Sequence, residues 1–230
     1  MSAPARHAPR PIGTTGAAQG YWEYLPAGYG AARPSPLLLF LHGLGENGDG
    51  GAELERVLAH GVPRLIAEDR WDDALPFVVL SPQHEGPRCH TAEGIRAVLE
   101  HALARYALDR SRLYATGLSC GGTGLWSYLA EDRDRFLAAA IPIAGDGRDA
   151  WARAGCALGR VPIWALHGEG DTIVPVAGTR VPIQGLRACE GAIEARMTIY
   201  PGAGHDSWTR SYDGSAGHDL YAWLLEHVHA

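Results

Sequence analysis

Lysine is absent from this 230-residue chain, and all 20 of its basic residues are arginine. This absence excludes a P-loop lysine, a Schiff-base lysine and a serine–lysine dyad. Acidic residues outnumber basic ones and give a formal net charge of −6. That balance argues against a nucleic-acid partner, which selects for a basic surface. With 46% hydrophobic residues, the chain nevertheless has enough apolar material for a buried core.

Long apolar runs are also missing. The longest, Leu37 to Leu41, has the length of a strand and falls far short of the roughly 20 residues of a membrane span. The opening stretch MSAPARHAPRPIGTTG contains arginines but no apolar segment that would suit a signal peptide. We therefore expect a cytoplasmic protein without a membrane partner.

Cysteine is scarce and scattered. The four cysteines show no CxxC spacing of the kind that holds zinc, so we expect no metal. In a cytoplasmic protein we expect reduced and mostly buried thiols. Two disulfides would form only if the chain were exported by a route that the sequence does not reveal. The cysteines are Cys89, Cys120, Cys156 and Cys189.

Apolar runs alternate with stretches of helical periodicity along the chain. The runs are continuously apolar, which is typical of parallel strands covered on both faces. Strand followed by helix, repeated, predicts an α/β fold with a mostly parallel central sheet and helices on both faces. The expected strands are Leu37–His42, Pro76–Ser81, Arg112–Thr116, Ala138–Ile143, Val161–His167 and Arg196–Tyr200, and the expected helices are Ala52–His60, Ala92–Ala107, Gly122–Ala130, Pro182–Cys189 and Ser215–Val228.

The chain shows no internal repeat and no second zone of composition, so we expect one domain. Residues 1–18 are rich in Pro, Ala and Gly and are expected to form a flexible N-terminal arm, with residues 19–230 as the single domain. The segment Tyr21–Tyr24 is expected to add an antiparallel edge strand. Fewer than about twenty residues separate the expected strands at Ala138–Ile143 and Val161–His167, which is too few for a large lid.

A serine lies at a predicted strand-to-helix turn. Residues 117–121 read GLSCG and fit the pattern G-x-S-x-G, directly after one expected strand and directly before an expected helix. A sharp turn there holds the serine in a strained backbone conformation, and the flanking glycines let strand and helix approach. Ser119 is therefore the predicted nucleophile of a nucleophile elbow. The pattern alone also describes a glycine-rich turn with an incidental serine.

A serine hydroxyl needs a base, usually a histidine oriented by a carboxylate. Asp171 and His205 each follow an expected strand in a glycine-rich loop. The order Ser119, Asp171, His205 is that of an α/β-hydrolase catalytic triad and differs from the order in two other familiar serine-protease folds. Glu169 and His218 remain the alternatives for the acid and the base.

Attack on a carbonyl carbon places negative charge on its oxygen, and two backbone N–H groups are needed to form an oxyanion hole there. One is the amide of Cys120, directly after the nucleophile. The other is expected from the loop after the first long strand, where we assign the amide of Leu44. His42 is expected to anchor that loop by hydrogen bonds. Trp208 and His90 are expected to contribute to the substrate-binding pocket.

The sequence resembles the α/β-hydrolase superfamily and, within it, small bacterial carboxylesterases and predicted peptidases of the phospholipase/carboxylesterase and dienelactone hydrolase-like family. The resemblance rests on LLLFLHGLGENGDG, RLYATGLSCGGTGLW, HGEGDTIVP and YPGAGHDSW, and it spans about residues 20–228. It implies cleavage of carboxylic esters through an acyl-enzyme intermediate, without a cofactor and with the same triad and amides. Two departures border the expected pocket: Cys120 replaces a methionine, and residues 83–92 lack a tryptophan.

A serine carboxylesterase that acts on a small-molecule ester is thus the predicted function. Dienelactone hydrolases place cysteine at the nucleophile position, and the serine found here argues against that activity. A serine peptidase or thioesterase of the same fold is the alternative. An inactive hydrolase-fold receptor or interaction module is a more remote one.

Overall fold

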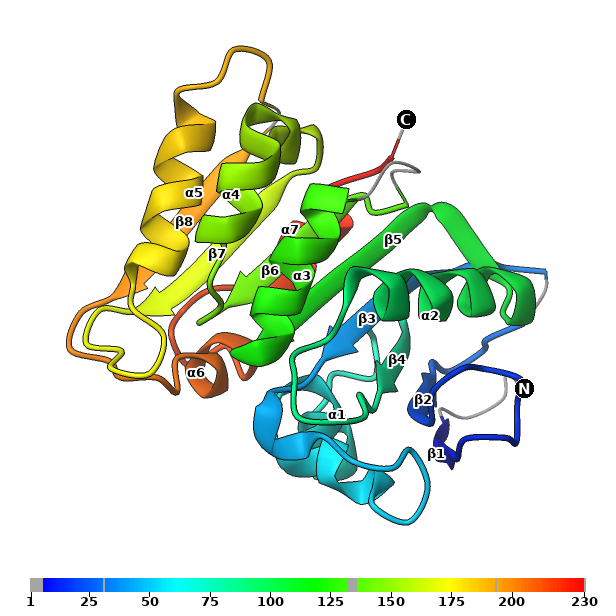
Figure 1. Ribbon diagram of the computed structural model, residues 1–230. Coiled ribbons are helices and arrows are strands. Elements are labelled where there is room, and N and C mark those ends of the chain that lie inside the picture. Colours follow the sequence, from blue (N-terminus) through cyan, green and yellow to red (C-terminus); the bar gives the residue numbers. More distant parts are fainter. Residues whose placement is uncertain (1–5, 31, 132–135, 193, 230) are drawn as a thin grey trace.

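A single mixed sheet forms the centre of the molecule. The computed structural model describes residues 6–30, 32–131, 136–192 and 194–229. Within them, the strands follow the order β1-β2-β4-β3-β5-β6-β7-β8 (Figure 1). All neighbours from β4 to β8 are parallel, whereas β1 and β2 are antiparallel. The strands are β1 Arg6–Arg10, β2 Tyr21–Leu25, β3 Ser35–Leu41, β4 Val78–Pro82, β5 Leu108–Leu118, β6 Ala139–Ile143, β7 Ile163–Gly168 and β8 Ala195–Tyr200.

Helices cover both faces of this sheet. Helices α2, α3, α4 and α5 lie side by side over one face (Figure 1), and α1, α6 and α7 pack on the other. Successive residues of a strand point to opposite faces, so Leu37 and Leu39 of β3 enter one core and Leu38 and Phe40 enter the other. The helices are α1 Gly61–Ala67, α2 Ala92–Arg105, α3 Cys120–Glu131, α4 Arg148–Ala154, α5 Ala177–Arg187, α6 Trp208–Tyr212 and α7 Leu220–Leu225, with short 3-10 helices η1 Leu44–Glu46, η2 Leu54–Ala59 and η3 Gly155–Arg160.

The fold confirms the predicted α/β class and the six expected parallel strands. The helices differ more from their predicted bounds than the strands do. The stretch expected to be helical before residue 60 is the 3-10 helix η2, and α1 follows it with Pro63 in its first turn, where a proline is tolerated. Helix α5 begins five residues before Pro182, the start that the sequence predicts. None of the described helices is both long and apolar enough to cross a membrane.

The N-terminal arm differs from its prediction. Residues 6–10 form an edge strand that pairs along the whole of β2, so Tyr21–Leu25 is the second strand of the sheet and not its edge. The guanidinium of Arg10 lies 2.7 Å from the buried carboxylate of Glu23. Main-chain pairing and this ion pair hold a segment whose composition alone predicts a loose chain. The first part of the expected arm, residues 1–5, lies outside the described residues.

The expectation of reduced thiols is wrong, because the structure pairs all four cysteines. Cys89 bonds to Cys120 and Cys156 to Cys189, with Cα–Cα distances of 4.9 and 5.6 Å. Both distances lie in the range that a disulfide spans. The first bond joins the β4–α2 loop to the first residue of α3, and the second joins η3 to the turn after α5. The partners are 31 and 33 residues apart, so no short spacing reveals them.

Candidate active site

The carboxyl ends of the parallel strands meet at one edge of the sheet, where ligands bind in folds of this kind. Ser119 directly follows β5, Asp171 lies in the loop after β7, and His205 lies in the loop after β8. Because β5, β6, β7 and β8 are successive neighbours, these loops end beside one another. The topology therefore brings together three residues that are far apart in the sequence.

Ser119 has the strained backbone that the G-x-S-x-G pattern predicts. Its φ is +50°, in the left-handed region that residues other than glycine seldom adopt. The two flanking glycines have no room for a side chain. A Cβ at Gly117 would lie 2.7 Å from the backbone of Gly121, and one at Gly121 would collide with the carbonyl oxygen of Leu41. Close contact between β5, α3 and β3 thus fixes the elbow that carries the serine.

The three predicted side chains form one hydrogen-bonded chain. Ser119 Oγ lies 2.8 Å from His205 Nε2, and His205 Nδ1 lies 2.7 Å from Asp171 Oδ2. The carboxylate accepts a hydrogen bond from Nδ1–H, so Nε2 is unprotonated and can accept the proton of the serine hydroxyl. This arrangement suits the transfer of a proton from the serine to the imidazole.

Asp171 is held by more than the imidazole. Its Oδ1 accepts the backbone amides of Ile173 and Val174, both at 2.9 Å. Burial alone would raise the pKa of Asp171, but the hydrogen bonds from His205 and from these amides outweigh it, and the pKa lies below its ordinary value. A second buried imidazole, that of His167, places Nε2 3.2 Å from Asp171 Oδ2. The carboxylate is therefore fixed in its charged form.

The alternative acid and base lie elsewhere. Glu169 is exposed and pairs with Arg180 at 3.2 Å. His218 packs edge-on against Trp164, with ring centroids 5.5 Å apart. Neither residue takes part in the hydrogen-bonded chain to Ser119.

The amides assigned to the oxyanion hole begin two helices. Leu44 is the first residue of η1 and Cys120 the first residue of α3. The first N–H groups of a helix have no partner within the helix. Both residues line the same cavity as Ser119 and His205. The neighbouring amide of Gly43 is already used, because it donates to Glu46 Oε2 at 2.7 Å.

His42 anchors the loop after β3, as expected. Its Nδ1 donates to the carbonyl oxygen of Gly43 at 2.6 Å, and its Nε2 accepts the backbone amide of His84 at 2.9 Å. Burial lowers the pKa of His42 to about 4. With both ring nitrogens engaged, the imidazole supports the loop and is not a second base.

A cavity of about 440 Å³ opens over Ser119. Trp208 lies on its wall, with its ring edge-on to the ring of His205 at 5.0 Å. The expectation for His90 is wrong: this residue is buried, packs on the ring of His42 at 4.4 Å and is not among the described residues that line the cavity. Its loop turns inward over α3, where the His90 backbone closes over Gly124.

Several cavity residues were not predicted. Ile173 and Val174 follow Asp171 directly, and Glu46 is two residues after Leu44, so proximity to predicted site residues is a signal that could have found them. His60 and Cys89 come from separate segments, and no local pattern indicates them. Unpredicted lining residues include Glu46, His60, Cys89, Thr123, Ile173 and Val174.

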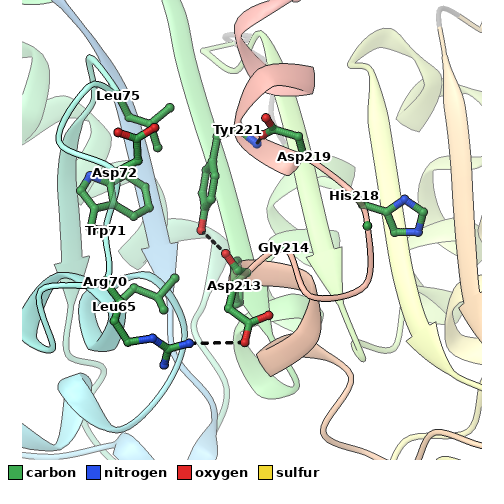
Figure 2. Close-up of a pocket in the computed structure, with 12 residues that line it drawn as sticks. Leu65, Arg70, Trp71, Asp72, Leu75, Asp213, Gly214, His218, Asp219 and Tyr221 are labelled. Atoms are coloured by element: carbon green, nitrogen blue, oxygen red, sulfur yellow. Dashed lines mark hydrogen bonds and ion pairs between the residues drawn. The ribbon is translucent and has the colours of Figure 1, made fainter.

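A larger cavity, of about 680 Å³, lies between the segment after α1 and the segment from α6 to α7 (Figure 2). Its charged groups are already engaged. Arg70 pairs with Asp213 at 3.5 Å, and Asp219 accepts the first amides of α7. The described residues that line this cavity include no serine, threonine or cysteine. It therefore offers none of the serine, threonine or cysteine nucleophiles that acyl transfer commonly uses.

No protein-family model matches the chain. Among solved structures it is similar to a thermostable esterase, with 27% identical residues and a TM-score of 0.71 over 97% of this chain and 63% of that one. It is also similar to a Klebsiella pneumoniae protein assigned as a dienelactone hydrolase, with 20% identical residues and a TM-score of 0.66 over 97% of this chain and 100% of that one. For an acylaminoacyl peptidase of Pyrococcus horikoshii the identity is 14% and the TM-score 0.61, over 93% of this chain and 39% of that one. The chain has the α/β-hydrolase fold, and it spans less than two thirds of the esterase chain.

Proposed function

We propose that the protein is a serine hydrolase that cleaves carboxylic esters through an acyl-enzyme intermediate. One observation carries the proposal: the continuous path from Ser119 Oγ through His205 to Asp171, with contacts of 2.8 and 2.7 Å. The similarity to a thermostable esterase, at 27% identity, supports an ester as the substrate.

The mechanism follows from the positions of these groups. Ser119 Oγ attacks the ester carbonyl carbon while His205 Nε2 takes its proton, and the amides of Leu44 and Cys120 donate to the oxyanion. His205 then returns the proton to the leaving alcohol, and the acyl group stays on the serine. A water molecule, deprotonated by His205, releases the acid. Each oxyanion donor contributes about 2.7–4 kcal/mol in the transition state.

A fluorophosphonate probe tests the nucleophile. We expect it to label the folded protein at Ser119, as located by mass spectrometry of the modified peptide. Ser119→Ala should abolish the label, and Ser215→Ala, at an exposed serine outside the cavity, should keep it. No label on the folded wild-type protein would favour the inactive receptor and refute the proposal.

A substrate panel tests the reaction. Peptidases and thioesterases use the same triad, so p-nitrophenyl esters of graded acyl length are compared with aminoacyl and prolyl amides and with acyl thioesters. We expect kcat/KM to be highest for an ester. A higher kcat/KM for an amide or a thioester would replace the proposed activity with one of those two.

A further inference from the structure

One carboxylate on the cavity wall has no part in the triad. Glu46 ends the short helix η1 and is only 7% exposed, yet it lines the cavity that contains Ser119 and His205. Its Oε2 accepts the Gly43 amide at 2.7 Å and so supports the loop that carries Leu44. This bond accounts for one of its two oxygens.

The second oxygen, Oε1, has no hydrogen-bond partner among the described residues. His60 Nε2 lies 3.8 Å from it, beyond hydrogen-bond distance. Oε1 is not among the fully buried side-chain atoms that lack a partner, so it keeps some accessible surface on a residue that lines the cavity. Burial raises the pKa of the Glu46 carboxyl, and the opposing effects of His60 and the Gly43 amide do not offset that cost.

The carboxylate lies close to the nucleophile. A methyl group placed at Gly43 would be 3.1 Å from Glu46 Oε2 and 3.8 Å from Ser119 Cβ. Glu46 Oε2 therefore lies within about 7 Å of Ser119 Cβ, a span that a substituent on the carbon next to the scissile carbonyl can bridge. Aromatic rings continue the wall toward the triad, with His60 packed on Trp208 at 5.8 Å.

The cavity offers this charge no permanently cationic partner, because His60 is charged only when it is protonated. The described residues that line it include no arginine, and the sequence contains no lysine. A carboxylate with one open oxygen in a confined space is compensated best by a cation. We propose that Glu46 Oε1 binds an ammonium group of the substrate, so that the preferred esters carry a protonated amine near the scissile carbonyl. This preference rests on the ester hydrolysis proposed above.

The test compares isosteric esters in wild type and Glu46→Gln, because glutamine removes the charge but keeps an acceptor for the Gly43 amide. Ethyl esters of alanine, lactate and isobutyrate differ only in an ammonium, hydroxyl or methyl group on the acyl side. We expect the ratio of kcat/KM for the alanine ester over the isobutyrate ester to fall about tenfold or more in Glu46→Gln.

The controls separate charge from loop support. Glu55→Gln removes the same charge from an exposed residue of η2 outside the cavity and should keep the ratio. An equal loss on all esters in Glu46→Gln would overturn the proposal, since it would reduce Glu46 to a support of the loop. A fall confined to the lactate ester would overturn it in favour of a neutral hydroxyl group.

The two proposals can fail separately. If wild type hydrolyses neutral esters and the ratios stay the same in Glu46→Gln, only the ammonium preference is lost. If Ser119 is not labelled by the fluorophosphonate and none of the esters is cleaved, the ester hydrolase itself is refuted.

Discussion

Two cavities, of about 680 and 440 Å³, are built from different parts of this fold. The larger lies between the segment after α1 and the α6–α7 segment, and its charged side chains form an ion pair or accept backbone amides. The smaller lies at the carboxyl edge of the sheet, where a hydrogen-bonded chain ends at Ser119. Strand topology, and not volume, thus decides where reactive groups converge.

The largest expected effect comes from the smaller cavity. Ser119→Ala or His205→Ala should lower kcat on a neutral ester by a factor on the order of 10⁴–10⁶, because each removes a partner in proton transfer. His218→Ala, in the wall of the larger cavity, is the matched control. Steady-state kinetics decides the matter, and more than about a tenth of wild-type activity in either triad variant would refute the assigned role.

Replacing the carboxylate of Asp171 should lower kcat less than replacing Ser119 or His205. In Asp171→Asn the amide cannot accept from His205 and from the backbone amides of Ile173 and Val174 at the same time, so the imidazole loses its orientation. We expect kcat to fall on the order of 10³–10⁴-fold. Glu169→Gln changes the exposed acid in the same loop and should leave kcat close to wild type. Similar kinetics for the two variants would contradict the choice of Asp171.

Acid should destabilise the folded protein through the carboxylate of the smaller cavity. The pKa of Asp171 is lowered in the folded state. Its contribution to stability is therefore present above the unfolded value of about 3.9 and is lost only as the pH falls further, through the folded value. Urea unfolding followed by circular dichroism over this acid range measures the loss, and an equal loss in Asp171→Asn would contradict the prediction.

The two disulfides allow a matched comparison of stability with rate. They close loops of 31 and 33 residues, so Cys89→Ala/Cys120→Ala and Cys156→Ala/Cys189→Ala should each lower the free energy of unfolding by about 3–4 kcal/mol. The first pair should also lower kcat about tenfold, since it releases Cys120, whose amide we propose as an oxyanion donor. Urea unfolding and kcat are measured together. The same kcat in both double variants would show that the first bond does not position the amide.

The smallest effect is expected in the larger cavity. Arg70 is half exposed and pairs with Glu68 at 3.1 Å and with Asp213 at 3.5 Å. Arg70→Ala should lower the free energy of unfolding by at most about 1 kcal/mol, because water screens exposed pairs, and it should leave kcat/KM unchanged. A clear loss of ester turnover in this variant would mean that the two cavities are coupled.

The sequence predicted those parts of the fold that local patterns determine. Strands buried on both faces are continuously apolar, as Leu37–Leu41 illustrates, and the elbow at Ser119 needs small neighbours on both sides. Asp171 and His205 could be identified because a parallel sheet gathers the ends of its strands at one edge. Their positions were predicted from the sequence, and their catalytic roles remain proposals.

The remaining features depend on contacts between distant segments. Residues 6–10 become a strand only because β2 offers an unpaired edge and Glu23 needs a cation. The disulfides depend on which loops the fold brings together. His90 turns inward because its loop closes over α3, and His60 reaches Glu46 from another segment. None of these contacts can be predicted from the spacing of residues that are close together in the sequence.

The position of the Cys89–Cys120 bond has a practical consequence. One of its sulfur atoms belongs to the residue next to the nucleophile, and both cysteines line the same cavity. Adding dithiothreitol during purification can therefore change the catalyst itself and not only protect it. Rates obtained with and without a thiol reductant describe two covalent forms of the chain, and each preparation needs its count of free sulfhydryls reported beside its specific activity.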